Sequence, residues 1–470
     1  MSSRPGLGAE DENVRGTNIQ RNALALWVIN IAGQSTEPGV NSEFPSQTEK
    51  TSPQNGWGTA QPLTIAFGIY RLLPRGGLED NCIRIAEELD RRGHHVSLFV
   101  AGAYPDLPIT TISLAPSVAP LFNHSRVAHF AKAFIAASKN RFDRTVAFQP
   151  VPGADMLFVA DWIRNRAHLP LWLRLTPRFR TYAALEEQCF SASSHTRIIG
   201  LSEPQIRAYL DRYGTSSDRI AIVPPTLSLE KRKPERRTQA VRNRVRAEFG
   251  LDPKTPIWLW LGLQPAVKGL DRVLDALERH PQTHLLIGGL SQSQRKVRAF
   301  GADAMKRGVS DRVHWLGYVT GDKLLDCIAA ADVLSHPARV DVTGGVILEA
   351  IVNGLPVVAT SVCGFAGHIK DSGAGIVIEE PFDPKIFSAA LADVCGAENR
   401  NYSAKGIAYG TMPVLYSGTA AACDLIEASH WPVEYESAGR PGPNSSAISG
   451  DAFRTSSEPP QKKTSPIRPR

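Results

Sequence analysis

Apolar and polar residues form blocks along this chain that predict strands and helices in alternation. The apolar run Leu63–Tyr70 predicts a buried strand, and a glycine-containing turn follows it. In residues 78–93 apolar side chains recur every three or four positions, which predicts a helix that ends at Gly93. Residues 94–102 predict a second strand. Together these blocks predict a β-α-β unit of the kind that builds parallel sheets.

A second series of the same kind restarts near residue 256. The predicted strands lie at residues 256–262, 284–289, 312–318, 332–338 and 355–360. The predicted helices between them lie at residues 270–280, 323–332 and 344–354. The charged, proline-interrupted stretch 228–250 separates the two series and predicts a linker running into a solvated helix. We therefore expect an α/β protein with two Rossmann-like, doubly wound domains that face one cleft.

The composition of the ends sets the expected domain limits. Residues rich in Ser, Gly, Asn and Gln precede the first strand, and residues rich in Ser and Pro follow the last helix pattern, so both ends are expected to be disordered. The expected organisation is a leader at 1–61, an N-terminal domain at 62–226, a linker and leading helix at 227–253, a C-terminal domain at 254–412, a helix at 413–432 and a tail at 433–470.

Composition narrows the class of protein. The net charge of +7 and the pI near 9.1 indicate an anionic partner. Charge alone does not decide whether that partner is nucleic acid, a phosphate ligand or a membrane surface. No nucleic-acid-binding signature supports the first of these. No apolar run is long enough to span a bilayer, and the acidic residues at positions 10–12 argue against a secretion signal. The six dispersed cysteines predict free thiols and no zinc site.

The stretch RVDVTGGVILEAIVNGLPVVAT, residues 339–360, carries the most specific chemistry. Gly344 and Gly345 precede a predicted helix, whose first N–H groups and dipole can bind phosphate. Asp341 and Glu349 flank this turn, where their carboxylates could bind hydroxyls on either side of a diphosphate. A simple tight turn explains the two glycines equally well.

Asp341 and Glu349, with seven residues between them, resemble the donor-site motif of the retaining family 4 glycosyltransferases. The surrounding sequence, from about Leu63 to about Phe382, is similar to the lipopolysaccharide core glucosyltransferases of that family. The segments that carry the similarity are FGIYRLLPRGGLEDNCIRIAEELDRRGHHV, VPGADMLFVADW, LWLRLTPRFRTYAALE, IVPP, VKGLDR and HPARVDVTGGVILEAIVNGLPVVATSVCGFAGHI.

The resemblance implies a GT-B fold, an acceptor-binding N-terminal domain, a C-terminal domain that binds a nucleotide sugar (UDP-glucose in the most similar relatives), no cofactor and no metal. It implies that Lys268 neutralises the diphosphate and that Asp341 holds the transferred sugar. The other implied donor contacts are the ribose-binding Glu349, the backbone of Gly344, Gly345 and Val346, and the close-approach glycines Gly76 and Gly77. It also implies a monomer that binds a glycolipid acceptor at the cytoplasmic face of the cell membrane.

Several positions depart from the pattern of these relatives. Asp341 stands where the family usually has Glu, and Val267 stands where the core glucosyltransferases have an Arg before Lys268. Thr226 replaces a Gly, and Asn81 replaces an Asp of the N-terminal cleft, although Asp80 stands beside it. We expect these changes to affect the donor or the turnover and not the fold.

Arginines and aromatic residues alternate in residues 162–185, where no acidic residue occurs before Glu186. An anionic membrane surface and an ordinary basic loop both fit this composition. The expected membrane-surface residues are Arg164, Arg166, Trp172, Arg174, Arg178, Phe179 and Arg180.

Three aspartates are candidate acceptor ligands: Asp80, Asp155 and Asp161. A structural cap or loop role is equally consistent with their sequence context. Isolated histidines such as His336 favour a surface or core role. Two other functions stay open, namely a GT-B-fold epimerase of nucleotide sugars and a weakly active or non-catalytic sugar-nucleotide-binding protein.

Overall fold

The computed structural model describes residues 61–72, 76–102, 107–114, 122–163, 171–290, 295–396, 401–429 and 431. All of them belong to one compact unit, Ala60–Arg470. The predicted leader at 1–61 and tail at 433–470 therefore lie almost wholly outside the described residues. In the described part of the chain, all six cysteines are free thiols. None of the described helices is long and apolar enough to cross a membrane.

The first sheet is parallel and has the strand order β3-β2-β1-β4-β5-β6-β7. Its strands are β1 (Thr64–Ile69), β2 (His95–Val100), β3 (Thr110–Ser113), β4 (Arg144–Ala147), β5 (Met156–Phe158), β6 (Arg197–Gly200) and β7 (Ile220–Ile222). The helices between these strands are α1 (Gly77–Arg91), α2 (Asn123–Ser138), α3 (Leu171–Arg174), α4 (Pro177–Phe190) and α5 (Glu203–Tyr213).

The second sheet is also parallel and has the order β10-β9-β8-β11-β12-β13. Its strands are β8 (Ile257–Leu261), β9 (His284–Gly288), β10 (Val313–Gly317), β11 (Val333–His336), β12 (Val357–Thr360) and β13 (Gly375–Ile378). The helices of this part are α6 (Gln239–Glu248), α7 (Leu270–Glu278), α8 (Arg295–Lys306), α9 (Gly321–Ala330), α10 (Gly345–Val352), α11 (Ala366–Ser372), α12 (Pro384–Gly396) and α13 (Tyr402–Tyr409).

Both sheets are buried on both faces, as parallel sheets require. Ile65 and Phe67 of β1 belong to the apolar cluster that α1 covers. Ala66, between them, packs with Phe134 of α2 on the other face. Two further clusters lie on the two faces of the second sheet. The predicted α/β fold with two doubly wound sheets is confirmed, and the strands and helices predicted within the two alternating series agree with the observed bounds to within two residues at each end. The helix predicted at 413–432 is shorter in the structure and spans Gly418–Glu427.

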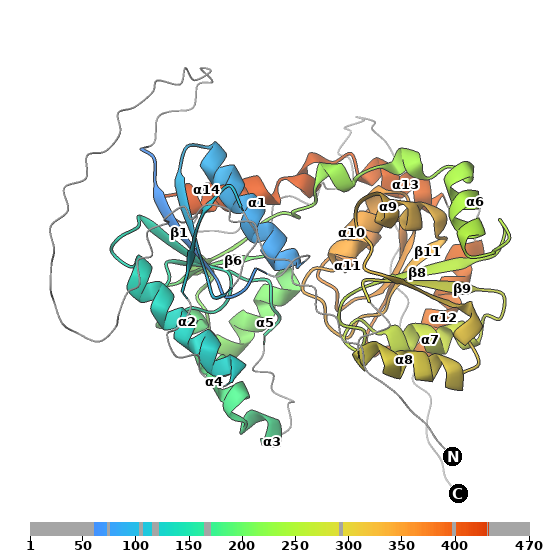
Figure 1. The fold of residues 1–470 in the computed structure, drawn as a ribbon, viewed down its shortest axis with the longest axis horizontal. Helices are drawn as coiled ribbons and strands as arrows, with labels where there is room; N and C mark the ends of the chain where they lie inside the picture. The colour runs from blue at the N-terminus through green and yellow to red at the C-terminus, as the bar shows by residue number, and fades with distance from the viewer. Residues whose placement is uncertain are drawn as a thin grey trace, which may run out of the picture. The chain divides into compact units, whose positions relative to one another are not determined.

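The last helix, α14 (Gly418–Glu427), packs against α1 and so returns to the first sheet (Figure 1). Its buried residues Cys423 and Ile426 join the cluster that contains β1. Arg92, at the end of α1, pairs with Asp424 at 2.7 Å and with Glu427 at 2.8 Å. This long-range packing completes one face of the first sheet with residues from the other end of the chain.

Helix α6 exposes most of its residues, as its charge predicts, but it buries one of its arginines. Arg246 is 1% exposed, and its guanidinium lies 2.9 Å from Asp332. Arg242 pairs with the same carboxylate at 2.6 Å. Asp332 also accepts a hydrogen bond from the backbone N–H of Ile257, at the start of β8. The arginines therefore fasten α6 to the amino ends of β8 and β11, because a buried charge is stable only when it is paired.

Removing the Asp332 carboxylate should destabilise the protein strongly. Asp332→Ala leaves Arg246 buried without a counter-charge, which costs about 3–5 kcal/mol. We expect a clear fall in the midpoint of thermal unfolding measured by calorimetry. Asp322→Ala is the matched control, because Asp322 pairs with Arg236 at the surface and is 80% exposed. An equal, small effect of both substitutions would contradict this role of Asp332.

Candidate active site

A cleft of about 1370 Å³ lies at the carboxyl ends of the strands of both sheets. It is lined by the loops that follow β1 and β5 in the first sheet and β8, β9 and β11 in the second. Helices α1 and α10 both begin at this cleft. Ligands of parallel α/β sheets bind at this edge, because helix N-termini and loops meet there.

The start of α10 forms a backbone site for an anion. Gly344 is the N-cap residue and has φ +76°, a conformation that favours glycine. It is buried, and its N–H donates to Asp341 Oδ1 at 3.0 Å. The exposed Gly345 and the half-buried Val346 line the cleft in the first turn of α10, where N–H groups have no partner within the helix. The available cradle is therefore Gly345 and Val346, whereas the N–H of Gly344 is already used.

Asp341 is the most constrained side chain of the cleft. It is 8% exposed, and its Oδ2 lies 2.6 Å from Lys268 Nζ and 2.8 Å from His336 Nε2. Burial alone would raise the pKa of Asp341, but the hydrogen bond and charge of His336, together with Lys268, hold it well below its usual range. Burial alone would lower the pKa of His336, but Asp341 and Cys363 raise it to about 9. At neutral pH the carboxylate is thus ionised between two cations.

His336, Asp341 and Cys363 bring potential metal ligands within 4.8 Å of one another. All three residues are buried. The Lys268 ammonium contacts the same Asp341 oxygen as His336, so the protein itself supplies positive charge at this oxygen. A metal ion there would have to displace both the ammonium and the imidazolium proton.

Glu349, one turn into α10, faces the cleft and pairs with Lys231 at 2.7 Å. Lys231 comes from the charged segment before α6, and the Glu349 side chain is 14% exposed. The side-chain amide of Asn353 donates to the backbone oxygens of both Lys231 and Glu349, which holds the two chain segments together. A lysine therefore pairs with each of the carboxylates that the sequence singles out: Lys231 with Glu349 and Lys268 with Asp341.

Val267 stands where the related glucosyltransferases have an arginine, so this chain has one cation fewer beside Lys268. Arg339 lies next to Val267. The backbone N–H of Arg339 donates to the carbonyl oxygen of Val267 at 2.8 Å. Its guanidinium, however, forms a two-point ion pair with Asp271, at 2.8 and 2.6 Å. The positive charge of Arg339 is thus matched locally, which leaves Lys268 as the cation of this loop that contacts Asp341.

The first sheet contributes the opposite wall of the cleft. Gly76, Gly77, Asp80 and Asp161 all line it, as their predicted roles require. The structure thus brings them into the same cleft as Lys268, Asp341 and Glu349. Their contacts with a donor or an acceptor remain predictions.

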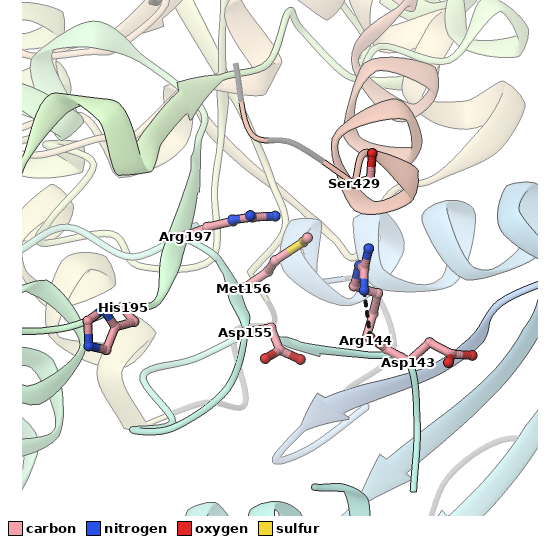
Figure 2. A pocket seen from close by; sticks show the side chains of 7 residues that line it. All are labelled: Asp143, Arg144, Asp155, Met156, His195, Arg197 and Ser429. Carbon is pink, nitrogen blue, oxygen red and sulfur yellow. Dashed lines mark hydrogen bonds between the residues drawn. The ribbon is translucent and has the colours of Figure 1, made fainter. Parts of the chain in front are cut away.

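Asp155 lies at the opposite edge of the first sheet and not in the cleft. It precedes β5, at the amino ends of the strands, and lines a pocket of about 280 Å³ with Arg144 and Arg197 (Figure 2). Its carboxylate accepts hydrogen bonds from the N–H and the hydroxyl of Thr145, both at 2.8 Å. The structure therefore gives Asp155 a role in joining β4 to β5, in place of the predicted contact with an acceptor.

The basic, aromatic segment is divided between the cleft and the surface. Arg178 and Phe179 line the cleft, whereas Trp172 is 70% exposed and lies outside it. Arg174 is half-buried and Arg180 is exposed. Arg164 and Arg166 lie outside the described residues.

Sequence reasoning missed three side chains that the structure places at this site. His336 lies at the end of β11, five residues before Asp341, and the hydrophobic pattern of the strand gives no indication of its contact with Asp341. Lys231 and Arg84 reach the cleft from a charged segment and from the middle of a helix. A signal for His336 was available, because a strand's last residue and the following loop share the carboxyl edge of a sheet.

Comparisons with known proteins agree with this geometry. The family model of the glycosyl transferases group 1 matches residues 241–410. The chain is 32% identical over 381 residues to the lipopolysaccharide glucosyltransferase WaaG of Escherichia coli strain K12, a match that covers 77% of this chain and 98% of that protein.

Solved structures extend the agreement to the fold. The crystal structure of WaaG, a glycosyltransferase involved in lipopolysaccharide biosynthesis, superposes with a TM-score of 0.69 at 31% identity and covers 77% of this chain and 99% of that one. Alr3699/HepE of Anabaena in complex with UDP-glucose superposes with a TM-score of 0.59 at 16% identity over 77% of this chain and 98% of that one. The chain therefore belongs to the glycosyl transferases group 1 family and is a glycosyltransferase with a GT-B fold.

Proposed function

We propose that this glycosyltransferase moves a hexose, with UDP-glucose as the donor, to a lipopolysaccharide core or similar glycolipid, with retention of the anomeric configuration. The observation that carries the proposal is the convergence of the α10 N-terminus, Lys268 and Glu349 on one cleft. Similarity to WaaG, named as a lipopolysaccharide glucosyltransferase, supports the acceptor class and the sugar. The solved complex of Alr3699/HepE with UDP-glucose supports the donor.

In the proposed reaction the bond between the sugar C1 and the diphosphate breaks, and a bond from C1 to an acceptor oxygen forms. Negative charge grows on the departing diphosphate, and the proton of the acceptor hydroxyl passes to an oxygen of that leaving group. The N–H groups of Gly345 and Val346 and the ammonium of Lys268 stabilise that charge, because fixed donors in a cleft need no reorganisation during the reaction. Glu349 binds the ribose hydroxyls, which take the place of Lys231 beside its carboxylate.

Both oxygens of Asp341 are engaged by Gly344, Lys268 and His336. Under this proposal Asp341 touches the transferred sugar only where a hydroxyl replaces one of these donors. Its first task is to hold Lys268 and the start of α10 in position.

We place the acceptor at the cytoplasmic face of the cell membrane. Trp172 and Leu175 are 70% and 64% exposed, and Arg174 lies between them in the sequence. Phe122, at the start of α2, is 64% exposed, and the neighbouring Asn123 donates to the Tyr182 hydroxyl of α4. Apolar side chains beside arginines suit the headgroup region of an anionic bilayer.

Product analysis tests the proposed activity directly. The protein is incubated with labelled UDP-glucose, with and without a lipopolysaccharide-core acceptor that lacks the terminal sugar. We expect UDP release and a new α-linked glycoside that both depend on the acceptor. Conversion of the donor alone would indicate an epimerase instead, and binding without either product would indicate a non-catalytic protein.

Glu349→Gln should weaken the binding of both UDP and uridine. A charge-assisted hydrogen bond contributes about 1.5–3 kcal/mol, so affinity should fall roughly ten- to hundred-fold. Isothermal titration calorimetry measures both ligands. Glu230→Gln is the control, because Glu230 is exposed next to Lys231 but does not line the cleft. Unchanged affinity in Glu349→Gln would show that the ribose does not bind to this carboxylate.

Lys268→Ala should lower the transfer rate by about two to three orders of magnitude, the usual effect of losing one fixed donor to a developing anion. Val267→Arg should preserve or raise the rate, because it adds a cation beside the diphosphate. Steady-state kinetics with the labelled donor measure both variants. Wild-type turnover by Lys268→Ala would place the diphosphate elsewhere.

Membrane attachment should depend on the arginines beside Trp172. Each cation near an anionic leaflet contributes about 1 kcal/mol, so Arg174→Gln with Arg180→Gln should reduce partitioning to anionic vesicles roughly thirty-fold. Sedimentation with anionic and neutral vesicles at low and high salt measures this. Arg91→Gln with Arg207→Gln is the control, with the same change in net charge on exposed helix surfaces. Equal loss in both double variants would show that only net charge matters.

A further inference from the structure

Arg84 is a cation in the wall of the cleft that is not in an ion pair with any carboxylate in the described part of the chain. It lies on α1, two turns from the N-terminus, and lines the cleft together with Gly76 and Gly77. Among the described residues it forms no ion pair, although three other cleft cations do: Lys231 with Glu349, Lys268 with Asp341, and Arg339 with Asp271.

The partners of Arg84 are all neutral. Its Nη1 donates to the carbonyl oxygen of Thr226 at 2.8 Å, and its Nη2 donates to Asn81 Oδ1 at 2.8 Å. Its Nε lies 3.3 Å from the carbonyl oxygen of Asp80, one turn back along α1. These contacts fix the plane and the direction of the guanidinium, but they leave its charge unmatched.

The surroundings make an unmatched charge at this point costly. Asn81, the side chain in contact with Arg84, is 7% exposed. Partial burial lowers the pKa of Arg84, and the more distant carboxylates of Asp80 and Glu349 act in the opposite direction. An arginine nevertheless stays protonated in a protein, so the site holds a positioned, partly dehydrated cation. An aspartate at position 81 would place a negative charge beside the guanidinium, whereas the amide of Asn81 is neutral.

The position of Arg84 relative to Glu349 indicates what the cation binds. The two side chains line the same cleft and interact electrostatically, yet they are not in contact. In a nucleoside diphosphate the α-phosphate is attached to the same ribose whose hydroxyls Glu349 is proposed to hold. A cation that lines the same cleft as that carboxylate, on the opposite wall, is therefore placed to bind a phosphate oxygen.

We propose that Arg84 binds a phosphate oxygen of the donor's nucleoside diphosphate and supplies from α1 the second side-chain cation that the loop before Lys268 lacks. The inference rests on the proposed function, since it takes Glu349 as the ribose ligand. It gives Asn81 a role as well, because a neutral side chain there keeps the guanidinium charge available to the ligand. Binding of the diphosphate then links α1 to α10 across the cleft.

The test compares UDP with uridine, which differ by the diphosphate. We expect Arg84→Gln to reduce UDP affinity roughly ten- to hundred-fold in calorimetry and to leave uridine affinity within a factor of two. Arg84→Lys should retain part of the UDP affinity, because it keeps the charge. Arg91→Gln, on the exposed side of the same helix, should change neither ligand. The unfolding midpoint of each variant shows whether it is folded.

Asn81→Asp is the second arm of the test. It restores a carboxylate beside Arg84 without changing the size of the side chain, and we expect UDP affinity to fall by at least several-fold. In the Arg84→Gln background the same substitution should have a smaller effect, because the two residues act on one ligand group.

Equal losses of affinity for UDP and for uridine in Arg84→Gln would overturn the inference. Unchanged affinity for UDP would also overturn it, and a raised KM for the acceptor would then place Arg84 on the acceptor side. Failure of the proposed function is separately visible. The wild-type protein would then bind neither UDP nor uridine.

Discussion

The carboxylate of Asp341 joins the parts of the second sheet on which the cleft depends. It contacts Lys268 from the loop after β8, His336 from the end of β11, and the N-cap of α10. Backbone geometry supports these contacts: Gly269 has φ +71°, and a side chain there would overlap the carbonyl oxygen of Pro337. A buried carboxylate needs such partners, and the partners in turn are held in place by it. Asp341 therefore fixes Lys268 and the start of α10 relative to each other at the cleft.

Ion pairs also hold the rest of the structure in register. Asp332, at the amino ends of the second sheet, fastens α6 through Arg242 and Arg246, and Arg92 fastens α14 to α1. At the carboxyl ends, two further ion pairs join segments of the cleft: Lys231 with Glu349 and Lys268 with Asp341. Under the proposed function, the ribose hydroxyls bind Glu349 and the diphosphate binds Lys268.

The hydrophobic pattern was enough to predict the two parallel sheets, because strands buried on both faces appear as short apolar runs between amphipathic helices. It could not predict that α14 returns to α1 or that Arg246 of α6 is buried, since both depend on contacts between segments far apart in the sequence. At the site, Asp341, Gly345 and Glu349, which the sequence singles out, all line one cleft. The sequence did not reveal that Gly344 uses its N–H for Asp341, that His336 shares this carboxylate, or that Asp155 lies at the opposite edge. Single side-chain partners are set by three-dimensional packing, which periodicity does not encode.

The protonation state of His336 tests the central role of Asp341 most directly. Nitrogen NMR of histidine-labelled protein reports whether both ring nitrogens carry protons. The account predicts a doubly protonated His336 at pH 7.5 that loses its proton only near pH 9, and a neutral ring at pH 7.5 once Asp341→Asn removes the counter-charge. A neutral His336 at pH 7.5 in the wild-type protein, or a charge unaffected by Asp341→Asn, would contradict it.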